Sequence, residues 1–132
     1  MHRRRLCHIV IDVSDLDAGV AFWAAALGAA EEPIDAGSTH IYRRLRLPGN
    51  AARLLLQRVP ETTQANSPVH LDLETDDVDA EARRLEALGA HRVRLEQERG
   101  HRFWVMADPF GNELCVLAPE FPDLLAAEEP VA

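Results

Sequence analysis

Apolar and polar residues alternate along residues 6–13 and again along residues 69–75 of the 132-residue chain. Alternation with a period of two, in segments rich in leucine and β-branched residues, predicts a strand with one apolar face. Apolar residues at helical spacing follow the second of these strands, at Val78, Ala82 and Leu85. The segment after the first strand is also predicted to be a helix, and it is more apolar than the second. Each predicted strand is therefore followed by a predicted helix.

Both predicted helices have recognisable ends. Ser14-Asp15 and Thr75-Asp76 supply side-chain oxygens that can cap the first helical turn. Gly28 and Gly89 stand where a left-handed C-terminal cap is required. Three more extended stretches are expected after each helix, at roughly 30–35, 39–47 and 52–59, and then at 91–96, 101–107 and 113–118.

The two halves of the chain are copies of one unit. His8 to Ala18 and His70 to Ala80 both begin with histidine and end with Asp-Ala, at an offset of 62 residues. Leu-Gly-Ala follows in each copy at an offset of 61. A repeat constrains the architecture more than any single element does. This repeat predicts an α+β fold of two β-α-β-β-β modules that form a curved mixed sheet, with the helices on its outer face.

The chain is expected to form one domain over residues 1–132. Module one spans about 6–59, a linker follows at 60–68, and module two spans about 69–118. The remaining segment, 119–132, is an acidic tail in which a short helix is expected at Leu124 to Glu128.

Composition and charge exclude several classes of protein. The formal net charge is -8, which does not support nucleic-acid binding because a phosphate-binding surface needs clustered cations. No apolar run approaches the length of a membrane span. We therefore expect a cytoplasmic protein that binds neither nucleic acid nor membrane. The local cluster of Arg43, Arg44 and Arg46 is either a solvated strand face, the favoured interpretation, or an anion site for a carboxylate or phosphate.

The two cysteines, Cys7 and Cys115, are too few for a disulfide framework. In a reducing compartment we expect both to be small buried residues rather than reactive thiols.

Four polar side chains are expected on the inner face of the sheet. Side chains alternate across a strand, and the apolar neighbours of His8 and His70 suit the helix side. The same argument places Gln57 and Glu113 inside. Two imidazoles, a carboxylate and an amide oxygen can bind a divalent first-row metal (Mn, Fe, Co, Ni or Zn) and leave positions open.

The alternative is that each of these side chains is hydrogen-bonded or solvated. No cysteine is counted among the four donors, so a structural zinc site is not expected.

Five segments together resemble a known family. They are His8-Ile-Val-Ile-Asp12, Phe22-Trp23-Ala-Ala-Ala-Leu-Gly28, Gln57-Arg-Val-Pro-Glu61, His70-Leu-Asp-Leu-Glu-Thr-Asp-Asp-Val-Asp79 and Asp108-Pro-Phe-Gly-Asn-Glu-Leu-Cys-Val-Leu117. They resemble the glyoxalase-like members of the vicinal oxygen chelate superfamily, which includes glyoxalases, bleomycin-resistance proteins and dioxygenases. The resemblance covers residues 6–118.

The resemblance implies paired modules that curve round a cavity, frequent homodimers, and a metal at the positions of His8, Gln57, His70 and Glu113. Whether the cavity is closed within one chain or shared across a dimer stays open.

The function implied is metal-dependent action on a small molecule with vicinal oxygens, of lyase, isomerase or epimerase type. The metal acts as a Lewis acid while a base removes a proton. Glu113, by leaving the metal, and Asp72, about 7 Å along the strand from His70, are the candidate catalytic residues. For Asp72 a structural role, paired with an arginine, is the favoured alternative. The alternatives are a metal-free protein that sequesters an apolar ligand, as bleomycin-resistance members do, and a metal-free remnant with an interaction role.

Overall fold

The computed structural model describes residues 1–49, 52–60, 68–98 and 100–131. Its first half contains β1 (Arg4–Val13), α1 (Leu16–Leu27), β2 (Ala30–Glu32), a short 3-10 helix (Ala36–Ser38), β3 (Tyr42–Arg46) and β4 (Arg53–Arg58). Its second half contains β5 (Val69–Thr75), α2 (Val78–Ala87), β6 (His91–Glu98), β7 (His101–Ala107), β8 (Glu113–Leu117) and α3 (Pro122–Ala126). The predicted α+β class and the repeated β-α-β-β-β order are confirmed. The 3-10 helix was not predicted, and most of the expected linker, 61–67, lies outside the described residues.

The chain forms two compact units. The N-terminal unit is His8–Val69, and the C-terminal unit combines Met1–Cys7 with His70–Ala132. Strand β1 therefore contributes its first residues to one unit and its remaining residues to the other. The expected single domain, with modules at 6–59 and 69–118, stays a prediction.

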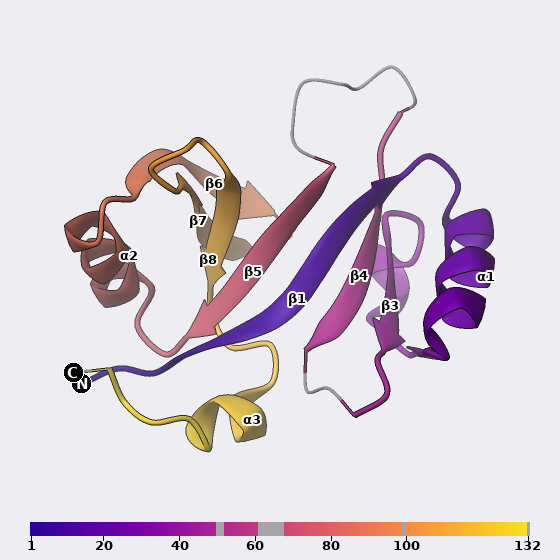
Figure 1. Cartoon of the computed structure of the whole chain (residues 1–132), viewed down its shortest axis with the longest axis horizontal. Coiled ribbons are helices and arrows are strands. Elements are labelled where there is room, and N and C mark those ends of the chain that lie inside the picture. The colour runs from indigo at the N-terminus through magenta and orange to yellow at the C-terminus, as the bar shows by residue number, and fades with distance from the viewer. Residues whose placement is uncertain (50–51, 61–67, 99, 132) are drawn as a thin grey trace. The chain divides into compact units, whose positions relative to one another are not determined.

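The N-terminal unit is a four-stranded mixed sheet covered on one face by α1. β1 pairs in parallel with β4, β4 is antiparallel to β3, and β3 is antiparallel to β2. Helix α1 lies beside β3 and β4 (Figure 1). Its core contains buried leucines, against which the alternate residues of β1 pack: Leu16, Leu45, Leu54 and Leu56, with Ile9, Ile11 and Val13. The predicted apolar face of β1 thus lies under the helix.

The C-terminal unit repeats this arrangement. β5 pairs in parallel with β8, β8 is antiparallel to β7, and β7 is antiparallel to β6. Helix α2 covers one face, where Ala82, Met106 and Val116 are buried and Leu114 and Trp104 pack against them. In both units the helix side of the sheet is the apolar side, because burying that surface stabilises the fold.

The helix caps correct one expectation. Asp15 caps α1 by accepting a hydrogen bond from the Ala18 amide at 3.0 Å. Helix α2 is capped by Asp77, which accepts from the Ala80 amide at 3.0 Å, and not by the predicted Thr75-Asp76. Asp77 stands 62 residues after Asp15, so the repeat itself was the better guide to the cap.

A buried ion pair ties both ends of the chain to the C-terminal unit. Arg5 donates to Glu74 at 2.9 Å, and the carboxylate of Glu74 also accepts the amides of Glu120 at 3.2 Å and Phe121 at 3.0 Å. The Val131 amide donates to the carbonyl oxygen of His2, so the termini lie side by side (Figure 1). The helix in the tail is α3, which begins and ends two residues earlier than expected.

No helix among the described residues is long and apolar enough to cross a membrane.

Candidate metal centre

Two polar side chains on β5 lie close together. His70 and Asp72 are two residues apart on a strand and therefore share one face of the sheet. His70 Nε2 is 3.5 Å from Asp72 Oδ1, and the side chains are 21% and 11% exposed. An imidazole nitrogen and a carboxylate oxygen thus meet at a site that is sheltered but not sealed from solvent.

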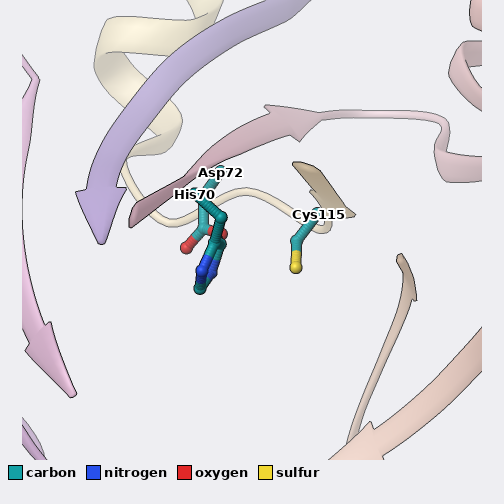
Figure 2. Close-up of side chains that lie close together, drawn as sticks. All are labelled: His70, Asp72 and Cys115. Carbon is teal, nitrogen blue, oxygen red and sulfur yellow. The ribbon is translucent and has the colours of Figure 1, made fainter. Parts of the chain in front are cut away.

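Cys115 on β8 completes this cluster. One ligand atom from each of His70, Asp72 and Cys115 lies within 4.8 Å of the other two. Figure 2 shows the His70 and Asp72 side chains next to each other and the Cys115 sulfur on the same side of the strands. In a tetrahedral site with metal–ligand bonds of roughly 2.0–2.3 Å, two ligands lie about 3.3–3.8 Å apart, so side-chain movements of about 1 Å bring the three atoms to the spacing that a single ion requires.

Strand pairing explains why these three residues meet. In the parallel ladder of β5 and β8, Leu73 pairs with Val116 and Asp72 pairs with Cys115. Val116 packs in the core under α2, so its ladder partner Leu73 takes the helix side. Asp72 and Cys115 consequently share the opposite face.

Burial and nearby negative charge both act on the Cys115 thiol. Burial raises its pKa well above the ordinary value, and the carboxylates of Asp72 and Glu113 raise this pKa further, while Arg94 lowers it. The low-polarity surroundings and the two carboxylates disfavour a thiolate anion. Without a bound cation, the thiol is therefore protonated at neutral pH.

The other predicted residue of this unit, Glu113, lies two residues before Cys115 on β8 and shares its face. Its side chain is 27% exposed, and its Oε2 is 3.7 Å from Arg94 Nη1. Because this carboxylate is partly exposed, a small molecule can reach it. The Arg94 guanidinium is the cation beside it.

The remaining predicted ligands, His8 and Gln57, belong to the N-terminal unit. His8 on β1 is 3% exposed. In the parallel ladder of β1 and β4, His8 pairs with Arg53 and Gln57 pairs with Asp12. His8 and Gln57 share a face but are four residues apart along the strands, about 13 Å. The structure does not bring these two side chains together within their unit, and the four-ligand set stays a prediction.

Cys115 is the donor that sequence reasoning missed. Alternation along the last strand puts it on the same face as Glu113, but the cysteine was interpreted as a small buried residue. The available signal was its position, two residues after a predicted ligand on the same face.

Comparison with known proteins confirms the family. The model of the glyoxalase-like domain family matches residues 8–117, and the chain belongs to this family. The resemblance inferred from the five segments is thereby confirmed. No curated protein matches the chain.

Several solved structures share the fold. A methylmalonyl-CoA epimerase from Mycobacterium tuberculosis is 24% identical, with 92% of this chain and 91% of that chain covered and a TM-score of 0.63. A methylmalonyl-CoA epimerase from Streptomyces coelicolor, in complex with 2-nitronate-propionyl-CoA, is 22% identical, with coverages of 89% and 99% and a TM-score of 0.62. A glyoxalase/bleomycin resistance protein/dioxygenase superfamily member from Vibrio splendidus 12B01 is 16% identical, with coverages of 88% and 99% and a TM-score of 0.59.

Proposed function

We propose that this chain is a metal-dependent enzyme that acts on a small molecule with two neighbouring oxygens, by lyase, isomerase or epimerase chemistry. One observation carries the proposal: His70 and Asp72 present an imidazole nitrogen and a carboxylate oxygen on one face of the sheet, with a third donor within 4.8 Å of both. Nitrogen and oxygen donors of this kind bind divalent first-row metals. Membership of the glyoxalase-like family supports the same kind of chemistry.

The residues of the C-terminal unit divide into two roles. His70 and Asp72 would hold the divalent ion, and its positive charge would stabilise negative charge that develops on a substrate oxygen. Glu113 is the candidate base, because its partly exposed carboxylate lies on the same face as Cys115. Asp72, the other predicted catalytic residue, is assigned to the metal.

The proton transfer that follows requires no oxidant or reductant. The Glu113 carboxylate accepts the proton from the carbon next to a substrate carbonyl, and the electrons of that C–H bond move onto the carbonyl oxygen. Return of a proton to the opposite face of the carbon gives epimerisation, whereas its return to a neighbouring atom gives isomerisation. Loss of a leaving group instead gives a lyase product.

The substrate is proposed only by class. Small molecules with vicinal oxygens are the first to screen, and acyl-CoA thioesters belong in the same screen because the Streptomyces epimerase is described with a propionyl-CoA compound. The homodimer that the family implies stays a prediction, for which sedimentation of the purified chain is the direct measurement.

The test is the metal content of the chain purified without a chelating tag, beside a His70→Ala variant. We expect about one divalent metal per chain in the wild type and its loss in the variant, because the imidazole is a ligand. His101→Ala is the matched control, since His101 is an exposed histidine on β7 of the same unit, and it should keep the metal.

A folded wild type that contains no metal, and takes up none of Mn, Fe, Co, Ni and Zn, would overturn the proposal. That result would favour a metal-free ligand-binding protein.

A further inference from the structure

The Cys115 sulfur occupies a fixed position beside the two proposed ligands. β8 is hydrogen-bonded on both sides, so Cys115 pairs with Asp72 of β5 and with Val105 of β7. Strand pairing, and not a loop conformation, therefore holds the thiol beside His70 and Asp72. A third donor held by a rigid element can bind an ion with little reorganisation.

The second cysteine provides an internal comparison. Cys7 is fully buried, and its thiol donates to the backbone carbonyl oxygen of Asp72 at 3.4 Å. This is an ordinary environment for a buried cysteine, which acts as a small apolar residue with a weak donor. Cys115 instead meets an imidazole and a carboxylate. Its thiol is hydrogen-bonded to the Asp72 side chain, so the sulfur is directed at one of the two proposed ligands.

We propose that Cys115 binds as a thiolate to the ion held by His70 and Asp72, and that this site prefers thiophilic divalent metals such as zinc and cobalt to manganese or magnesium. The inference rests on the proposed function, because it concerns the same ion. It narrows the predicted range of metals by adding a soft ligand to the donor set.

Ligand chemistry supports this preference. Thiolates select soft and borderline metals such as zinc, whereas carboxylate, carbonyl and water ligands suit magnesium and manganese. Three protein ligands also match the pattern of zinc sites that keep a fourth position open for water or substrate. A sulfur ligand is therefore compatible with the proposed chemistry.

Cobalt(II) is the probe, because a bound thiolate gives it a strong near-ultraviolet charge-transfer absorption. The full-length chain is freed of metal by a chelator, and cobalt is added to the wild type, Cys115→Ser and Cys7→Ala. We expect the absorption to rise to one equivalent in the wild type and in Cys7→Ala. It should be absent in Cys115→Ser, whose cobalt affinity should fall by more than the roughly 10- to 100-fold that loss of a partner outside the ligand set costs.

Metal competition on the wild type tests the preference directly. One equivalent of zinc should abolish the cobalt absorption, and a large excess of manganese or magnesium should leave it. If Cys115→Ser does not fold, the wild type and Cys7→Ala still decide the question, because the chain has two cysteines and absorption kept in Cys7→Ala identifies Cys115.

The outcomes separate this inference from the proposed function. Stoichiometric cobalt binding without the charge-transfer absorption, or absorption kept in Cys115→Ser, would overturn the role of Cys115 and leave the metal site standing. Displacement by manganese as effective as by zinc would overturn the preference. A folded wild type that binds none of these metals would overturn both proposals.

Discussion

Glu81 and Arg84, one turn apart on α2, form a two-pronged ion pair around a fully buried carboxylate. Arg84 Nε lies 2.7 Å from Glu81 Oε1, and Arg84 Nη2 lies 2.8 Å from Oε2. His2 Nε2 is 2.8 Å from the same Oε1. The helix that covers the sheet of the C-terminal unit is thus tied to the N-terminus of the chain through one carboxylate.

This arrangement predicts a pH-dependent contribution of Glu81 to stability. Burial raises the pKa of the carboxyl, but the hydrogen bonds from Arg84 and His2 outweigh it and leave the pKa below its ordinary value of 4.5. A carboxyl with a lowered pKa stabilises the folded state above that ordinary value, and the contribution is lost as the pH falls through the folded pKa. Glu81→Gln should therefore lower the free energy of unfolding by about 1.5–3 kcal/mol at neutral pH, the range for hydrogen bonds to charged groups.

Urea unfolding at several pH values measures this effect. The difference in free energy of unfolding between the wild type and Glu81→Gln should become smaller as the pH falls below 4.5. Glu86→Gln on the same helix is the control: its pair with Arg92 is exposed, so its removal should cost at most about 1 kcal/mol. If Glu81→Gln lowers the free energy of unfolding by the same amount in acid as at neutral pH, the prediction is contradicted.

Glu74→Ala should cause the larger loss of stability. It leaves the Arg5 guanidinium buried without its carboxylate and also removes the acceptor of the Phe121 amide. Removing one partner of a buried pair costs about 3–5 kcal/mol. Chemical denaturation measures the loss, and faster hydrogen exchange at the Phe121 amide should accompany it. Arg102→Ala removes an exposed pair of the same unit and should have little effect; equal losses in the two variants would refute the prediction.

Neither thiol should react readily at neutral pH in the metal-free protein. Burial is the largest cause that raises the pKa of both Cys7 and Cys115, and the thiolate is the reactive form. Alkylation by iodoacetamide, followed by mass spectrometry of the intact chain, should be much slower than that of free cysteine and should accelerate as the pH rises. Rapid labelling of Cys115 at neutral pH would show that its surroundings favour the thiolate instead.

Glu113→Gln should separate catalysis from metal binding. If Glu113 is the base and not a ligand, the variant keeps its metal but loses about 10²–10⁴-fold in turnover of any substrate that the screen identifies, the usual contribution of a positioned acid or base. Metal analysis and kcat measured on the same preparation decide this. Loss of the metal in the variant would restore Glu113 to the ligand set predicted from the sequence.

Gly28→Ala should destabilise the N-terminal unit. Gly28 ends α1 with a φ of 64°, a left-handed conformation that costs a residue with a Cβ atom about 1–2 kcal/mol. Nearby atoms leave room for the added methyl group, since the nearest is Pro48 Cγ at 3.9 Å. Thermal unfolding should therefore report backbone strain alone, and an unchanged melting temperature would contradict this explanation.

Several elements follow from the sequence because their causes are local. Alternation predicted β1 and β5, which the structure contains. It also predicted the face that β1 presents to its helix, and the positions of Ile9 and Ile11 in the core under α1 confirm that face. Gly28 was predicted as a left-handed cap from its place after the helix, and its φ bears this out. The family, too, was recognisable from contiguous segments.

The composition of the candidate site depends on tertiary structure. A period of two tells which face a side chain takes but not which residue lies opposite it on the next strand. Register comes from pairing between segments that are far apart along the chain. Pairing places Cys115 opposite Asp72 and separates Gln57 from His8 by four residues. The sequence by itself therefore determined the repeated modules and which residues of a strand share a face, whereas strand register decided which donors on a face meet.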